Sequence, residues 1–226
     1  MKQVDARSRS LVKTVFDAES RLFYMNGDHN NMGYIVGGFF ESRAVKPVVI
    51  YLDIHSDARL PEDGPHSGTW LSEVFDRGEC EKAYLVGMSL LSNSDAAIQN
   101  LEKNNVSFRD YSWDEIQRRG GSRLAIPLFT DQIIEDIRKR YGKDYPVIVS
   151  ICADTVCGLP SSASNEVVGY PSEDVYPMMS ELTKRLNVEC LNVSELKPSL
   201  DKTKNLASGE FLQYSLYLYS QTLLGK

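Results

Sequence analysis

The chain has 226 residues, of which 42% are hydrophobic and 25% are charged, and its net charge is −6. Length and composition predict one globular α/β domain over residues 1–226, and the acidic balance leaves no basic surface for nucleic acid or anionic membranes. No apolar stretch approaches the roughly 20 residues that cross a bilayer, and the N-terminus lacks the apolar core of a signal peptide, so we expect a cytoplasmic protein.

Short apolar runs alternate along the chain with segments of helical period. The runs predict strands at 21–25, 47–54, 83–88, 106–111, 146–151 and 188–193. The helical period predicts helices at 94–104, 129–142, 172–186 and 211–224, the last packed on the sheet. Ser172 is expected to cap the start of its helix, and Gly142 to end the helix before it. This alternation predicts an α/β fold with three αβα layers around a mostly parallel sheet.

Ligand-type side chains follow four of the predicted strands. In an open α/β sheet, ligands bind at the carboxyl ends of the strands, so these groups are expected to meet at one edge. After the first, second, fifth and sixth predicted strands come, respectively, Asp28 and His29; Asp53, His55 and Asp57; Cys152, Asp154 and Cys157; and Glu195.

The stretch DIHSD, residues 53–57, places three such groups at alternate positions. Residues two apart on an extended backbone point to the same side, so Asp53, His55 and Asp57 would converge on one point. Imidazole and carboxylate together suit a divalent ion such as Mn²⁺, Zn²⁺ or Fe²⁺. All three histidines of the chain, His29, His55 and His66, fall within this part of the sequence. The alternative is that the carboxylates only cap the following loop.

The motifs NGDH, DIHSD, SICAD and SELKP, each closing a strand and in this order, resemble those of the arginase and agmatinase superfamily, the ureohydrolases. GPHSGTW and CGLPSSAS resemble the formimidoylglutamase branch most. The resemblance implies an arginase-like fold, a binuclear manganese centre, and hydrolysis of a small cationic amidine- or guanidine-type substrate. It also implies a homo-oligomer, a trimer or hexamer, and an N-terminal part shorter than is usual in the family.

Carried over by motif, the resemblance implies two sets of metal ligands. His29, Asp53 and Asp57 resemble the ligands of one metal, and His55, Asp53 and Asp154 those of the other, with Asp53 shared. Two cations would lower the pKa of a bound water and supply a nucleophile without a serine or cysteine. Asp28 is expected to accept hydrogen bonds from its loop or to orient a ligand, rather than to bind metal itself.

Two further residues resemble catalytic groups of the family. Glu195 resembles the acid that pairs with the cationic end of the substrate, and a carboxylate suits the paired N–H donors of an amidinium. A solvated acid in a turn is the alternative. His66 could carry a proton to the departing amine, as a loop histidine does in arginases. Depending on the register of the loop, Ser67 takes that position instead, and His66 is then an exposed loop residue.

Cys152 departs from the family pattern, because the first residue of the third motif is normally an aspartate that bridges both metals. A thiolate would preserve the negative charge but favour Zn²⁺ over Mn²⁺, whereas a neutral thiol would weaken the second site. Cys157 also stands where the family often has an aspartate. Both could instead be buried thiols without a ligand role.

Three hypotheses follow from these residues. The first is a hydrolase of linear C–N bonds with one or two metals, and the retention of His29, Asp53, His55, Asp57 and Asp154 favours it. The second is a degenerate arginase-like protein that binds metal weakly or not at all and serves a regulatory or scaffolding role. In the third, the ligands hold a single ion for another hydrolytic or a structural purpose.

Overall fold

The computed structural model describes residues 2–60, 66–159, 169–201 and 206–224. In this part of the chain, six strands form one sheet in the order β1-β6-β5-β2-β3-β4, and every pairing is parallel. The strands are β1 (Leu22–Met25), β2 (Val48–Leu52), β3 (Lys82–Val86), β4 (Val106–Ser107), β5 (Pro146–Cys152) and β6 (Asn187–Ser194).

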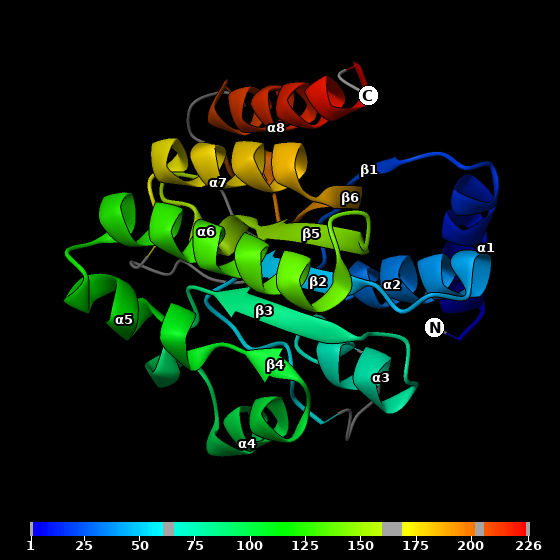
Figure 1. Ribbon diagram of the computed structural model, residues 1–226, viewed down its shortest axis with the longest axis horizontal. Coiled ribbons are helices and arrows are strands. Elements are labelled where there is room, and N and C mark those ends of the chain that lie inside the picture. Colours follow the sequence, from blue (N-terminus) through cyan, green and yellow to red (C-terminus); the bar gives the residue numbers. More distant parts are fainter. Residues whose placement is uncertain (1, 61–65, 160–168, 202–205, 225–226) are drawn as a thin grey trace.

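Helices cover both faces of this sheet (Figure 1). They are α1 (Lys2–Asp17), α2 (Asn31–Arg43), α3 (Trp70–Asp76), α4 (Asp95–Lys103), α5 (Trp113–Arg118), α6 (Ser122–Tyr141), α7 (Ser172–Arg185) and α8 (Leu206–Leu224). One core lies between the sheet and helices α5 to α8, and the other between the sheet and helices α1 to α4. The predicted three-layer αβα fold with a parallel sheet is therefore confirmed.

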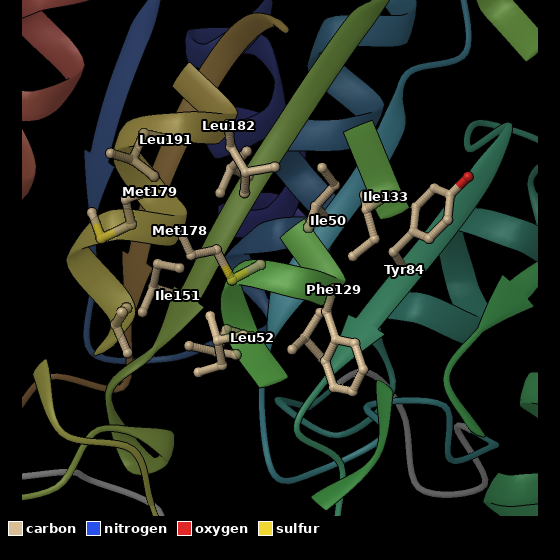
Figure 2. Packing of buried hydrophobic residues seen from close by; sticks show 14 of the residues in the cluster. Ile50, Leu52, Tyr84, Phe129, Ile133, Ile151, Met178, Met179, Leu182 and Leu191 are labelled. Atoms are coloured by element: carbon tan, nitrogen blue, oxygen red, sulfur yellow. The ribbon is translucent and has the colours of Figure 1, made fainter. Parts of the chain in front are cut away.

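Alternation along the central strands builds both cores at once. Ile50 and Leu52 of β2 belong to the core under α6 and α7, whereas Val49 and Tyr51 belong to the opposite one. Figure 2 shows side chains of α6 and α7 over those of β2 and β5. All five residues of β2 are buried, which explains why this strand reads as a continuous apolar run.

Some predicted boundaries are wrong. The strand expected at 106–111 ends at Ser107, and a 3₁₀ turn follows at Arg109–Tyr111. The helix expected at 129–142 begins at Ser122, although Gly142 does end it with φ at 93°. Ser172 is the first residue of α7 rather than its cap, because Pro171 takes the cap position.

The last helix lies at the outer side of α7, away from the middle of the sheet (Figure 1). Phe211, Leu218 and Tyr219 of this helix belong to the core on that side of the sheet, and the Tyr219 hydroxyl donates to the carbonyl of Glu189 in β6 at 2.9 Å. No helix in the described ranges has the length and apolarity to cross a membrane.

Candidate metal centre

One cavity of about 200 Å³ gathers all the metal-binding and catalytic residues predicted from the sequence. It lies at the carboxyl edge of the sheet, because β1, β2, β5 and β6 run parallel and the predicted residues follow their ends. The predicted residues that line it are His29, Asp53, His55, Asp57, His66, Cys152, Asp154 and Glu195. Asp28 and Cys157, which follow two of these strands, are exposed.

His29 is buried between two carboxylates, with only 1% of its surface exposed. Its Nδ1 lies 2.8 Å from Oδ2 of Asp53 and 2.7 Å from Oδ2 of Asp57. Burial alone would lower the pKa of His29, but the neighbouring Asp57 and Asp53 charges outweigh it and raise the pKa to about 10. Nε2 of the same ring lies 2.9 Å from Oγ of Ser150.

His55 stands on the other side of Asp53. Its Nδ1 lies 3.1 Å from Oδ2 of Asp154 and 3.5 Å from Oδ1 of Asp53. Burial lowers its pKa, and the stronger opposing effect of Asp154 and Asp53 raises it to about 11. Asp53 therefore directs Oδ2 toward His29 and Oδ1 toward His55. Asp53 thus presents one oxygen on each side and could serve an ion beside His29 as well as one beside His55.

Three buried polar atoms at this point make no hydrogen bond: Nδ1 of His29, Oδ2 of Asp53 and Oδ2 of Asp154. Nδ1 of His29 lies 2.8 Å from Oδ2 of Asp53, and Oδ2 of Asp154 lies 3.1 Å from Nδ1 of His55, but neither pair has the angles that a hydrogen bond needs. Buried polar atoms left without partners are uncommon, and three of them at one point indicate a place for a bound ion, ligand or water. The donors form two groups in which all ligand atoms lie within 4.8 Å of one another: His29, Asp53 and Cys152; and Asp53, His55 and Asp154. Nitrogen and carboxylate donors in this arrangement fit divalent cations.

Cys152 is the last residue of β5 and is buried. Burial, then the charges of Asp53 and Asp154, raise the pKa of its thiol well above the usual range. Asp57 is also buried, and burial together with the Asp53 charge raises its pKa. Its Oδ2 accepts a hydrogen bond of 2.7 Å from the indole Nε1 of Trp70. Asp57 has a backbone φ of 48°, in the left-handed region.

Glu195 follows β6 directly and also has a left-handed φ, 60°. Its Oε1 accepts a hydrogen bond of 2.9 Å from the backbone N–H of His29, and burial raises its pKa to about 7. His66 lines the cavity but is exposed, and its Nδ1 accepts from the backbone N–H of Gly68 at 3.2 Å. Ser67 lines the same cavity, so the geometry leaves both candidates for the proton-transfer position.

Several polar residues of the site were not found from the sequence. Oγ of Ser150 contacts Nε2 of His29 and accepts a hydrogen bond of 2.8 Å from Nδ2 of Asn192 on β6. Ser150 stands two residues before Cys152 on β5, so alternation along the strand could have placed it on the same face. Trp70 contacts Asp57 from a helix 13 residues later, and no local pattern signals such a contact. Arg59 and Asn93 also line the cavity.

The arginase family profile matches residues 2–214 of the chain. The formimidoylglutamase of Staphylococcus haemolyticus is 25% identical over 166 residues, which are 71% of this chain and 49% of that protein. The chain therefore spans about half the length of this curated relative.

Solved structures of the same kind share the fold. Formimidoylglutamase from Bacillus subtilis superposes with a TM-score of 0.83 at 18% identity, over 96% of this chain and 67% of that one. Trypanosoma cruzi formiminoglutamase, solved with Mn²⁺, gives a TM-score of 0.77 at 18% identity, over 97% and 71%. Arginase from Bacillus caldovelox gives 0.79 at 16% identity, over 96% and 74%. Because the family profile matches nearly the whole sequence and the fold agrees, this chain belongs to the arginase family.

Proposed function

We propose that the protein is a metal-dependent hydrolase of linear C–N bonds in an amidine, of the guanidino or formimino type. The observation that carries the proposal is the convergence of buried donor atoms, three of which make no hydrogen bond, in a cavity at the carboxyl edge of the sheet. Membership of the arginase family supports the same reaction class.

Two positions would hold the ions. His29, Asp57 and Cys152 would serve one, His55 and Asp154 the other, and Asp53 both. When bound, two divalent ions such as Mn²⁺ lower the pKa of a water molecule toward neutrality and so provide a hydroxide nucleophile. The protein's own part is to hold these donors out of bulk water and at fixed distances, which the surrounding hydrogen bonds to Ser150 and Trp70 accomplish.

Substrate orientation and proton transfer fall to residues at the cavity wall. Glu195 would pair with the amidinium N–H groups through its carboxylate. His66 uses Nδ1 to accept from Gly68, so Nε2 is the atom that would carry a proton to the departing amine. Arg59 also lines the cavity, and its guanidinium suits a carboxylate on the substrate. We therefore favour amidines that carry carboxylates, such as formimidoylglutamate, over agmatine, which carries none.

A second candidate is an arginase-like protein without catalytic activity. The observation in its favour is Cys152, because a protonated thiol in this environment withdraws one anionic ligand from the centre. The two candidates differ in metal content: the hydrolase binds divalent metal tightly, and the non-catalytic protein does not.

The test measures metal per chain and product release together. Metal-free protein is reconstituted with Mn²⁺, Zn²⁺ or Fe²⁺, and ammonia, formamide or urea release is followed with formimidoylglutamate, arginine and agmatine. We expect tight metal binding and release from at least one substrate. Asp53→Asn should lower both the metal content and the rate, the latter by at least about 100-fold, because Asp53 serves both positions.

A matched control is Asp136→Asn, which changes an equivalent carboxylate on the partly exposed surface of α6. It should leave metal content and rate unchanged. Protein that binds no metal tightly under any of these conditions would contradict the proposal. Metal-loaded protein that hydrolyses none of the three substrates would contradict the proposed reaction while leaving the metal centre standing.

A further inference from the structure

The two groups of donors in the cavity differ in their chemistry. His29, Asp53 and Cys152 bring a nitrogen, a carboxylate oxygen and a sulfur within 4.8 Å of one another. Asp53, His55 and Asp154 bring one nitrogen and two carboxylates at the same spacing, with no sulfur. An arginase-type centre with aspartate in place of Cys152 would have only nitrogen and oxygen donors on both sides. Here a single side chain makes the two sides unequal.

The position of Cys152 on its strand explains why its sulfur groups with His29. Ser150, which contacts Nε2 of His29, lies two residues earlier on β5, so both side chains are on the same face of the strand. Cys152 pairs with Ser194 of β6, the residue before Glu195, and Glu195 in turn accepts from the backbone of His29. Strand register and two hydrogen bonds therefore fix His29 next to the thiol.

We propose that the two positions of this centre select unlike ions: a thiophilic ion such as Zn²⁺ between His29, Asp53 and Cys152, and a harder ion such as Mn²⁺ between Asp53, His55 and Asp154. This inference rests on the proposed metal centre. Thiolate and imidazole are characteristic zinc ligands, whereas carboxylate-rich sites suit Mn²⁺.

Charge supports an ionised Cys152 in the loaded protein. A thiolate there, together with Asp53, Asp57 and Asp154, carries as many negative charges as two divalent cations carry positive ones. The thiol proton leaves to solvent when the ion binds, as it does at other thiolate sites. The buried thiol has no other role in the proposed hydrolysis, since the nucleophile comes from water.

The order in which ions occupy the two positions measures this selectivity, whereas the final metal content does not. Zn²⁺ binds more tightly than Mn²⁺ to nearly any site of nitrogen, oxygen and sulfur donors, so excess Zn²⁺ would occupy both positions. A single equivalent of the thiophilic ion is decisive, because it fills only one position, the one with the higher affinity.

The probe is Co²⁺ added to metal-free protein, since a thiolate bound to Co²⁺ gives a charge-transfer absorption in the near ultraviolet. We expect this absorption to grow up to the first equivalent of Co²⁺ and then to stop. Protein given one equivalent of Zn²⁺ and then excess Mn²⁺ should retain one ion of each per chain, and electron paramagnetic resonance should show isolated rather than coupled Mn²⁺.

Cys152→Asp should abolish the absorption and lower the preference of the first position for Zn²⁺ over Mn²⁺ by on the order of tenfold or more. Cys152→Ser, which is close in size, provides the same test should the aspartate variant fail to fold. Cys157→Ser is the matched control: this cysteine is in the same motif but exposed, and the variant should keep the absorption.

Three results would overturn the inference: Co²⁺ that binds to the wild-type chain without charge transfer, an absorption that persists in Cys152→Asp, or Mn²⁺ that displaces the single Zn²⁺. These readouts need no substrate. Protein that shows the expected filling order but hydrolyses no amidine supports the inference and contradicts the proposed reaction. Active protein without the absorption supports the reaction and contradicts the inference.

Discussion

Asp57 uses one oxygen for two tasks. Its Oδ2 accepts from Nε1 of Trp70 at 2.7 Å and lies 2.7 Å from Nδ1 of His29. The indole is completely buried and contacts the rings of Tyr51 and His29. Because a neutral donor holds the carboxylate without neutralising it, Asp57 is kept in place and remains available as a ligand.

Trp70→Phe should therefore weaken metal binding while the fold is kept. The substitution retains an aromatic ring but removes the N–H, so Asp57 loses the group that orients it. We expect the affinity for the first bound ion to fall by about 10- to 100-fold, measured by competition with a chelating dye.

Trp113→Phe is the control for the loss of a tryptophan. Trp113 contacts Tyr170, and neither residue lines the cavity, so its replacement should leave metal affinity unchanged. Equal affinity in Trp70→Phe and the wild-type chain would show that the hydrogen bond to Asp57 does not position a ligand.

At the scale of elements, the central strands were predictable and the edges were not. β2 and β5 are buried on both faces, so their sequences are nearly continuous apolar runs that can be recognised as strands. β4 has only two residues and pairs on one side, and the apolar residues after it turn inward instead of extending it.

The same reasoning explains what could be predicted of the site. Groups that immediately follow a strand, such as Asp53 and Glu195, share an edge by topology, and their order along the chain is enough to bring them together. Ser150 and Trp70 act through contacts between elements. Alternation along β5 indicates the face on which Ser150 lies, but which residues Ser150 and Trp70 contact depends on packing between elements that no local pattern specifies.

Gly87, directly after β3, shows how closely elements approach one another near the site. Its φ is 96°, and a Cβ there would lie 2.5 Å from the hydroxyl oxygen of Tyr170, a fully buried side chain. Gly87→Ala combines backbone strain with overpacking, so it should lower the free energy of unfolding by about 2–5 kcal/mol. Denaturant titration measures the change.

Gly121→Ala separates the two causes. Gly121 has nearly the same φ, 98°, but a Cβ there would meet no atom within 4 Å, so only the strain of about 1–3 kcal/mol remains. If both variants lose equal stability, the approach of Tyr170 to Gly87 does not constrain the fold.

For the whole molecule, metal bound at the proposed centre would raise the stability of the fold. The described chain buries Asp53, Asp57 and Asp154 around two histidines, and an ion that binds only the folded state stabilises it. At a free concentration 100 times the dissociation constant, one ion contributes about 2.7 kcal/mol. In a chain of 226 residues this corresponds to a rise of about 5–10 °C in Tm.

Calorimetry of chelator-treated and Zn²⁺-reloaded protein tests this expectation. Asp53→Asn should show a much smaller rise on reloading, because both positions lose a ligand. A Tm that is the same with and without metal would mean that the ions bind the folded and unfolded chains equally, or bind neither.

Asp57 and Glu195 both adopt left-handed backbone conformations, with φ of 48° and 60°. Such a conformation costs a residue with a side chain about 1 kcal/mol or more, and glycine adopts it without strain. At both positions, the substitution that relieves the backbone is thus the one that removes a carboxylate from the cavity. Selection for the stability of the metal-free chain alone would therefore favour loss of these acids, and variants with glycine at either position should be more stable than this chain when no metal is bound.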